Sequence, residues 1–279
     1  MNGNRFIGVT DSICFFIPFD FTTFRPSALR SDCTRPTGSP GIEGVRSEVL
    51  YKKAVLVERG SFRPPTNVNF NMLECGLEKF SADPAFAGKE VLPGFELTMR
   101  NLLADGDDVD RRDFLACADL LAACGMTVLV SDHFEYYRLA ANLAWRTKER
   151  VGIVLGAPSL IELFEEKYYT ALPGGILESF GRLFKNDLEL YVYPLLNGTT
   201  GVVTTVENLQ ISPELRKLYG YLDDRGSFVT LDNFNPDCLS IFSRDVLKKI
   251  AAGDDAWETM VPSGVSEMIQ KRHFFGCKG

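Results

Sequence analysis

Short apolar runs alternate with amphipathic stretches from residue 49 onward, and this alternation limits the folds open to the chain. The runs expected as strands are residues 54–57, 127–130, 151–155, 188–193 and 228–231. The stretches expected as helices are residues 66–80, 95–103, 113–123, 134–148, a short one from 159, 176–184, 213–222, 243–252 and 261–272. Strands that alternate with helices of roughly 10–15 residues are typical of parallel βαβ units. Uninterrupted β-branched runs are typical of strands covered on both faces. The sequence therefore predicts an α/β fold with a doubly wound, mostly parallel sheet, with residues 54–57 as an inner strand.

The first 48 residues differ from the rest of the chain. They show no sustained helical or strand period, and they contain Pro18, Pro26, Pro36 and Pro40. Proline-rich, aperiodic sequence is typical of irregular structure. Residues 1–48 are therefore expected as an irregular N-terminal extension, and residues 49–279 as one α/β domain. The apolar segment 13–19 contains a proline and is flanked by aspartates, so it does not predict a signal peptide.

The composition excludes several kinds of partner. The formal net charge is −7, so neither non-specific binding to nucleic acid nor attachment to an anionic membrane is expected. No apolar run approaches the roughly 18 residues of a membrane-spanning helix. The seven cysteines form no CxxC pair and no zinc-like cluster with histidine, so no metal site is expected. Scattered cysteines suit a reducing compartment. We expect a cytoplasmic protein, which can form a homo-oligomer.

The most specific local signal lies between Val55 and Asn69. An apolar strand runs into Gly60-Ser61, two prolines stiffen the loop that follows, and a helix begins near Thr66. The free N–H groups and the dipole of a helix start form an anion site at the carboxyl edge of a parallel sheet. The stretch is consistent with a phosphate-binding loop, and also with an ordinary strand–turn–helix connection.

The same stretch resembles a known family. Gly60-Ser-Phe-Arg-Pro-Pro-Thr-Asn-Val-Asn69 is similar to the first signature of the HxGH nucleotidyltransferases, Gly-Ser/Thr-Phe-x-Pro-x-Thr/His-x-Gly-His after a first strand. This family includes nicotinamide/nicotinate mononucleotide and phosphopantetheine adenylyltransferases. Two later segments resemble its closing signatures, namely Ser240-Ile-Phe-Ser-Arg-Asp-Val-Leu-Lys-Lys249 and Trp257-Glu-Thr-Met-Val-Pro-Ser-Gly-Val-Ser-Glu-Met-Ile-Gln-Lys-Arg-His-Phe-Phe-Gly276. The resemblance covers the two ends of residues 50–276 and leaves the middle unmatched.

The resemblance implies a Rossmann-like nucleotidyltransferase fold for residues 49–279. It also implies binding of ATP with Mg²⁺ and of a phosphorylated small molecule such as a pyridine mononucleotide. The implied reaction is adenylyl transfer with release of pyrophosphate, a step of NAD biosynthesis. The residues that match the family's nucleotide-binding positions are Gly60, Ser61, Phe62, Thr66 and Ser243. Asn69 and Arg244 stand at or near the catalytic positions.

The chain departs from the family pattern at its catalytic positions. Asn69 replaces the second histidine of the motif, which in the family stabilises charge on the α-phosphate. Asparagine can donate a hydrogen bond but carries no positive charge. Loss of one such electrostatic donor typically reduces the rate by about 10²–10³-fold. Leu247 stands where the family has arginine, and Arg244 and Lys248, both within one helical turn of it, are the candidate substitutes. The hypothesis is that two groups of residues face each other across one phosphate pocket, namely Gly60, Ser61, Thr66 and Asn69 on one side and Ser243 and Arg244 on the other.

Two other interpretations follow from the residues. A catalytically silent relative would bind a nucleotide and serve as a regulatory module. An unrelated Rossmann-like enzyme would have its site in Ser131-Asp-His-Phe-Glu-Tyr-Tyr137, after another expected strand, with Asp132 and His133 as acid–base groups. In the simpler alternative for this loop, Asp132 caps the next helix and His133 is solvated.

Overall fold

The structure is a computed structural model, and it describes residues 13–16, 49–84, 88–98 and 108–277. A seven-stranded sheet forms its centre, with strand order β1-β4-β3-β2-β5-β6-β9. All neighbouring strands are parallel except β1, which pairs antiparallel with β4 at the outer edge. The strands are β1 (Ile13–Phe16), β2 (Ala54–Gly60), β3 (Val91–Thr98), β4 (Val128–Ser131), β5 (Val151–Gly156), β6 (Glu189–Tyr193) and β9 (Phe228–Thr230). A separate hairpin pairs β7 (Leu195–Leu196) with β8 (Val203–Thr204).

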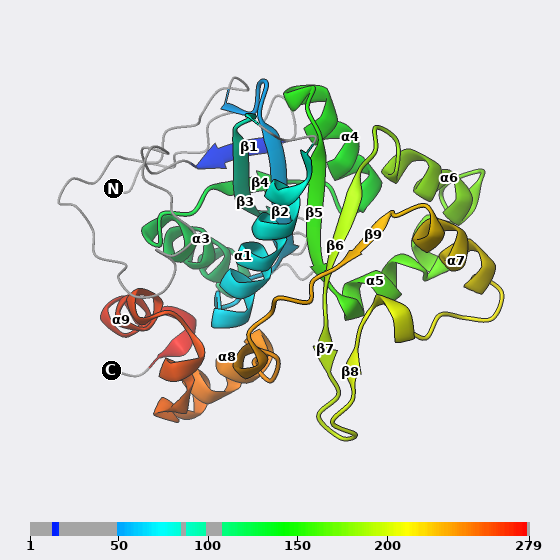
Figure 1. The fold of residues 1–279 in the computed structure, drawn as a ribbon. Helices are drawn as coiled ribbons and strands as arrows, with labels where there is room; N and C mark the ends of the chain where they lie inside the picture. The colour runs from blue at the N-terminus through cyan, green and yellow to red at the C-terminus, as the bar shows by residue number, and fades with distance from the viewer. Residues whose placement is uncertain (1–12, 17–48, 85–87, 99–107, 278–279) are drawn as a thin grey trace.

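Helices cover both faces of the sheet (Figure 1). They are α1 (Asn67–Ala82), α3 (Asp108–Ala123), α4 (Tyr136–Thr147), α5 (Ala157–Leu163), α6 (Gly175–Leu183), α7 (Arg216–Asp224), α8 (Ser243–Ala252) and α9 (Ser263–Arg272). The helices α1, α3, α8 and α9 share one buried cluster with the sheet, and α4 to α7 share another on the opposite face. Successive strand residues point to opposite faces, so Leu56 enters the first cluster and Val57 the second. The sheet is therefore doubly wound.

The strand order locates the point at which the chain reverses direction across the sheet. From β2 the chain adds β3 and then β4 on one side, with α1 and α3 on one face. It then crosses by α4 on the other face and adds β5, β6 and β9 beyond β2. Right-handed crossovers require this change of face. In such sheets ligands bind at the carboxyl ends of the strands at the switch point, which here lies between β2 and β5.

Most of the elements expected from the sequence are present. The predicted doubly wound parallel sheet is confirmed, and so is the predicted inner position of residues 54–57, because β2 lies between β3 and β5. The helix expected over 243–252 matches α8 residue for residue.

The helix expected over residues 95–103 is wrong for its first part. Phe95 to Thr98 belong to β3, which hydrogen-bonds to β2 on one side and β4 on the other; the rest of that range lies outside the described residues. Phe95 and Leu97 are buried toward α1, whereas Glu96 points to the opposite face. The spacing of apolar residues was compatible with a helix, but pairing with two neighbouring strands decided the conformation.

The N-terminal extension also contains one regular element. Ile13–Phe16 form β1 and pair with β4 from Ser131 to Val128. An irregular extension was expected here, so this strand is a departure from the sequence prediction. The structure leaves the remaining residues of 1–48 undescribed. Among the described residues, no helix is long and apolar enough to cross a membrane.

Candidate functional site

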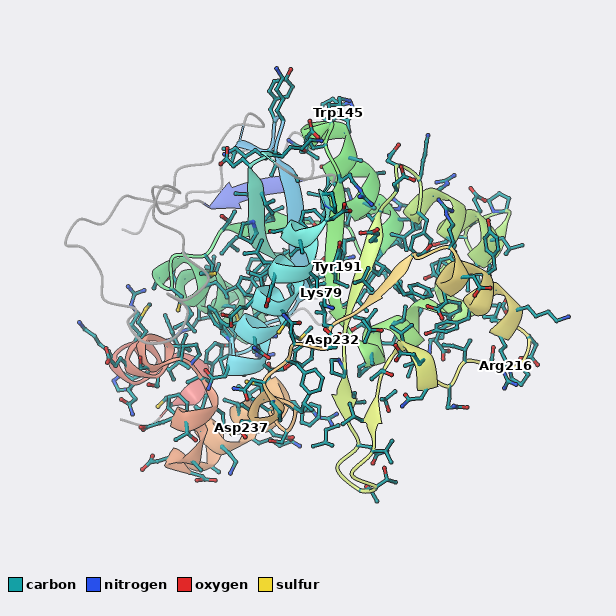
Figure 2. All side chains as sticks on the ribbon, viewed as in Figure 1. Lys79, Trp145, Tyr191, Arg216, Asp232 and Asp237 are labelled. Carbon is teal, nitrogen blue, oxygen red and sulfur yellow. The ribbon has the colours of Figure 1, made fainter. Side chains whose placement is uncertain are left out.

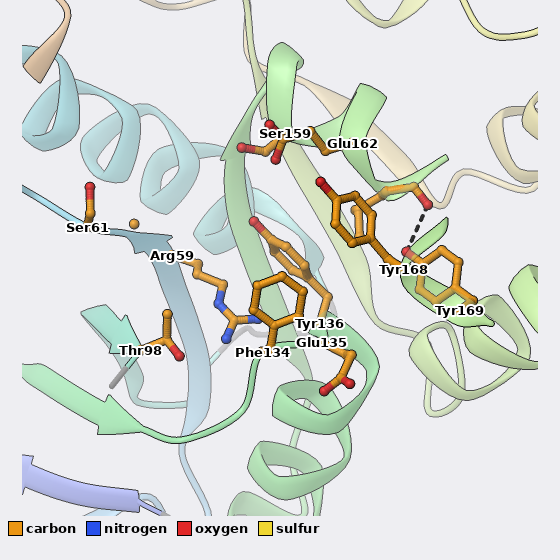
Figure 3. Close-up of a pocket in the computed structure, with 12 residues that line it drawn as sticks. Arg59, Ser61, Thr98, Phe134, Glu135, Tyr136, Ser159, Glu162, Tyr168 and Tyr169 are labelled. Carbon is orange, nitrogen blue, oxygen red and sulfur yellow. Dashed lines mark hydrogen bonds between the residues drawn. The ribbon is translucent and has the colours of Figure 1, made fainter. Parts of the chain in front are cut away.

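A pocket of about 300 Å³ lies at the switch point of the sheet. Figure 3 shows that its walls come from the end of β2, the end of β3, the loop before α4, and α5 with the short helix after it. The lining residues are Arg59, Gly60, Ser61, Thr98, Phe134, Glu135, Tyr136, Ser159, Glu162, Leu163, Tyr168 and Tyr169. Its position is the one that the topology of a doubly wound sheet favours for a ligand.

The glycine turn forms one wall of this pocket. Gly60 and Ser61 line it, whereas Phe62, the third residue predicted to bind a ligand in this turn, does not. Phe62 is buried and packs edge-on against Phe95, with ring centroids 4.9 Å apart. A Cβ atom at Gly60 would lie 3.0 Å from the Phe62 ring, so the glycine allows this close contact. Phe62 anchors the turn in the core, and its backbone φ of 47° is unusual for a bulky residue.

The side chain of Asn69 hydrogen-bonds to residues around the start of α1. Its Oδ1 accepts hydrogen bonds from the N–H of Thr66 at 3.0 Å and from the Thr66 hydroxyl at 2.9 Å. Its Nδ2 donates to Oε1 of Glu58 at 2.9 Å. Thr66 is the N-cap of α1 and is fully buried. Neither Thr66 nor Asn69 lines the pocket; their hydrogen bonds hold the start of α1 instead.

Glu58 is a buried carboxyl group on the α1 side of β2. Its exposed fraction is 1%, and burial raises its pKa well above the ordinary value, against the lowering effect of the Asn69 hydrogen bond. A carboxyl group with such a raised pKa holds its proton more readily than an exposed one. Because Asn69 donates to Oε1, the proton of the neutral acid belongs on Oε2.

Arg59 points to the other face of β2 and into the pocket. Its Nε lies 2.9 Å from Oε2 of Glu96 on β3, and its Nη2 donates to the backbone carbonyl of His133. Its guanidinium carbon lies 4.8 Å from the centroid of the Tyr136 ring. The Ser131 hydroxyl donates to the other oxygen of Glu96. Burial raises the pKa of Glu96, although the nearby Arg59 charge and the Ser131 hydrogen bond lower it.

Aromatic rings form the outer part of the pocket. Phe134 and Tyr168 are 43% and 39% exposed, and their ring centroids lie 6.0 Å apart at an interplanar angle of 55°. Deeper in the pocket, a side-chain hydrogen bond joins Tyr136 to Ser159, and burial raises the pKa of the Tyr136 phenol to about 12. Tyr136 is therefore a neutral hydrogen-bonding group at neutral pH. The pocket combines flat apolar surfaces with polar groups at its base, which suits a ligand with a planar ring.

Residues 240–249, the second segment that resembles a signature of the family, lie near the glycine turn but do not line the pocket. Figure 1 shows α8 beyond the same edge of the sheet as the start of α1. Asn67 at that start donates to the carbonyl of Thr259 at 3.0 Å, in the short helix η8 (Asp255–Met260) that packs on α8. Ser243 and Arg244 are absent from the pocket lining. The Arg244 guanidinium is exposed and lies 5.4 Å from the Phe242 ring centroid.

The loop after β4 contributes to the same pocket as the glycine turn. Phe134 to Tyr136 line it together with Gly60 and Ser61, so residues from the two regions proposed as alternative sites share one pocket, although Asp132 and His133 do not line it. Asp132 does not cap α4, because the N-cap residue is Glu135. His133 is not solvated either: its Nε2 is buried, and burial lowers its pKa despite the opposing effect of Asp132.

Several pocket residues were missed by sequence reasoning. They are Arg59, Thr98, Ser159, Glu162, Tyr168 and Tyr169. One signal was available for Arg59, because a charged pair, Glu58-Arg59, ends an otherwise apolar strand just before the glycine turn. Charged residues at the carboxyl end of a central strand point to both faces of the sheet, and such buried charges favour a functional site.

The topology defines a doubly wound α/β protein with a pocket at its switch point. No protein-family model matches the chain, and no curated protein sequence matches it. Among solved structures, the chain is similar to Plasmodium falciparum nicotinic acid mononucleotide adenylyltransferase complexed with APC and to the same enzyme complexed with NaAD. Both are 12% identical and cover 81% of this chain and 98% of their own, with TM-scores of 0.46 and 0.45.

Proposed function

We propose that this chain is a nucleotidyltransferase-like protein that binds a nucleotide in the switch-point pocket. The observation that supports the proposal is the pocket itself, which is lined by Gly60 and Ser61 at the end of the central strand β2. These residues belong to the segment that resembles the first nucleotidyltransferase signature. In this proposal a phosphate contacts the backbone N–H groups of the turn, and the planar ring packs on Phe134 and Tyr168.

The proposed reaction joins ATP to a phosphorylated small molecule such as a pyridine mononucleotide. The phosphate of the acceptor attacks the α-phosphorus of ATP, a new P–O bond forms there, and pyrophosphate leaves. The pocket volume of about 300 Å³ is at the low end for small-molecule sites, so it suits the acceptor. ATP would then extend past Ser61 toward the start of α1, where the helix N–H groups favour phosphate.

In this proposal Mg²⁺ binds as the complex with ATP and not at a separate protein site. In the described parts of the chain, no group of three or more His, Cys, Asp or Glu side chains is placed to hold a metal ion. Mg²⁺ usually keeps several waters and is bound through one or two carboxylates together with substrate phosphates, so such a group is not needed. Glu162, which is exposed on the pocket wall, is the carboxylate that would contact ATP-bound Mg²⁺.

A catalytically silent nucleotide-binding module is the second candidate, and the positions of two residues favour it. The Asn69 side chain is already used in three hydrogen bonds around the helix start. Arg244 is exposed and does not line the pocket. For the enzyme, we propose that Arg244 contacts the outer phosphates of ATP and that Asn69 acts by positioning the turn. In the silent module neither residue affects any reaction.

The two candidates separate in one pair of measurements. Calorimetry with ATP·Mg²⁺ and with nicotinate and nicotinamide mononucleotides measures binding, and a pyrophosphate-release assay measures transfer. Replacing Tyr168 with alanine is expected to weaken mononucleotide binding about 5–30-fold, since stacking on one aromatic ring contributes about 1–2 kcal/mol. Tyr221→Ala on α7 is the matched control, because this tyrosine is exposed and outside the pocket.

Each result assigns a function. Binding with pyrophosphate release supports the enzyme, and binding without release supports the silent module. If no mononucleotide or ATP binds, or if Tyr168→Ala and Tyr221→Ala behave alike, the pocket is not a nucleotide site.

A further inference from the structure

The hairpin of β7 and β8 ends in an exposed turn that begins with an Asn-Gly pair. The turn spans residues 197–202, between Leu196 at the end of β7 and Val203 at the start of β8. Every residue of this turn is exposed. Figures 1 and 2 show the hairpin extending beyond the central sheet, with its tip apart from the helices on either side. The backbone and the side chains of the tip are therefore accessible to water.

The side chain of Asn197 is held over its own turn. Its Oδ1 accepts hydrogen bonds from the N–H groups of Thr199 at 3.0 Å and Thr200 at 3.1 Å. The backbone fixes the same geometry, because the N–H of Asn197 donates to the carbonyl of Val202 at 2.9 Å and the N–H of Gly201 donates to the carbonyl of Asn197 at 2.8 Å. Two N–H donors on one carbonyl oxygen stabilise negative charge that develops there, as in an oxyanion hole. The side-chain amide carbon of Asn197 is therefore a polarised electrophile.

The backbone nitrogen of Gly198 follows this electrophile directly in the chain. Attack of that nitrogen on the side-chain carbon of Asn197 closes a succinimide ring, and both reacting groups are already in one molecule. Among the residues that the structure describes, none accepts a hydrogen bond from the N–H of Gly198. A Cβ atom at Gly198 would meet nothing within 4 Å, so the space beside the nitrogen is open. The glycine has no side chain of its own to hinder the attack.

We propose that Asn197-Gly198 is a self-modification site, at which the chain cyclises and water then converts the asparagine to aspartate and isoaspartate. The N–H proton of Gly198 passes to hydroxide, and the nitrogen forms a bond to Cγ of Asn197. The bond from Cγ to Nδ2 then breaks, and ammonia leaves after taking a proton from water. Water adds to either ring carbonyl and opens the succinimide. No electrons are exchanged, and water is the co-reactant. This inference does not depend on the proposed function.

The products differ in their effect on the turn. In the aspartate product, the carboxylate keeps the N–H donors of Thr199 and Thr200, and both hydrogen bonds become charge-assisted. In the isoaspartate product, the main chain runs through Cβ and Cγ of residue 197, which lengthens the turn and displaces the N–H of Gly201 from its carbonyl partner. Both products add a negative charge at the tip of the hairpin.

The experiment incubates the full chain at mildly alkaline pH and follows Asn197 by peptide mapping with mass spectrometry. Isoaspartate identifies the cyclic route, because direct hydrolysis of the amide gives aspartate alone. A peptide of residues 195–202 with blocked ends gives the rate without the fold. The folded chain should modify Asn197 about 3–10-fold faster than this peptide, because its two N–H donors bind the developing oxyanion more strongly than the neutral amide.

Asn208 is the matched control in the same sample. It is exposed, and its Oδ1 accepts a hydrogen bond from the N–H of Thr205 at 2.9 Å, but the residue that follows it is Leu209. A side chain beside the attacking nitrogen hinders ring closure, so Asn208 should stay unmodified while Asn197 is converted.

Gly198→Ala tests the nucleophile, and its folding is checked by circular dichroism. The added methyl group meets nothing in the fold but hinders the nitrogen, so the modification should be lost over the same incubation. Gly220→Ala on α7, where a Cβ atom also meets nothing within 4 Å, should be modified at the native rate. The inference is overturned if Asn197 stays unmodified, if aspartate forms without isoaspartate, if the folded chain reacts no faster than the peptide, or if Gly198→Ala is modified at the native rate.

Discussion

Replacing Asn69 with alanine is expected to lower the free energy of unfolding by about 3–5 kcal/mol. The change removes two hydrogen bonds from Thr66 and one to Glu58, each of which contributes about 0.5–1.5 kcal/mol net. It also leaves Glu58 without its hydrogen-bond donor at a site that is 1% exposed, and a buried unsatisfied group costs about 1–3 kcal/mol. For a chain of this size the melting temperature should fall by about 6–15 °C.

The assay is urea unfolding followed by circular dichroism, with the melting temperature as a second readout. Asn67→Ala is the matched control in the same helix turn, because this asparagine makes one exposed hydrogen bond to Thr259. It should change the free energy of unfolding by less than about 1 kcal/mol. In a Glu58→Leu background the Asn69→Ala change should have a smaller effect, because no buried carboxyl group remains to be left unpaired. If Asn69→Ala is no more destabilising than Asn67→Ala, the network does not stabilise the start of α1.

Two further predictions concern β2 and its neighbours. Burial raises the pKa of Glu58 above its ordinary value of 4.5, so its contribution to stability is complete below pH 4.5 and is lost as the pH rises through the raised folded value. Urea unfolding from pH 5 to pH 8 should therefore show a shallower loss of stability with pH in Glu58→Gln than in the native chain, and equal slopes would contradict the assignment. Gly152→Ala should lower the free energy of unfolding by about 1–3 kcal/mol, because a Cβ atom there would lie 2.8–2.9 Å from Leu56, Phe80 and Tyr191. Gly181→Ala in α6, where a Cβ atom meets nothing within 4 Å, should be neutral or stabilising, and a thermal shift of equal size and sign in both variants would refute the packing argument.

Much of the architecture could be predicted from the sequence because its cause is local. The period of apolar residues and the glycine turn reflect how each segment is buried, so β2, α1 and α8 were expected close to where they lie. The turn also predicted that Gly60 and Ser61 contact a ligand; both residues line the pocket, and ligand binding there stays a prediction. The prediction was wrong at β3. Its short apolar segment was compatible with the helical period and with the strand period, and pairing with β2 and β4 made it a strand.

The chemistry of the site depends on contacts between segments that are far apart in the sequence. Arg59 meets Glu96 and the loop after β4 only because β3 lies between β2 and β4 in the sheet. The motif match placed Asn69 at a catalytic position, yet the fold engages its side chain with Glu58 and Thr66. The sequence by itself determined the layered α/β pattern and the turn at the end of the central strand, since both follow from local burial and backbone preference. Only the tertiary structure decided which charged and aromatic side chains share the pocket, because strand order sets those neighbours and no local pattern records it.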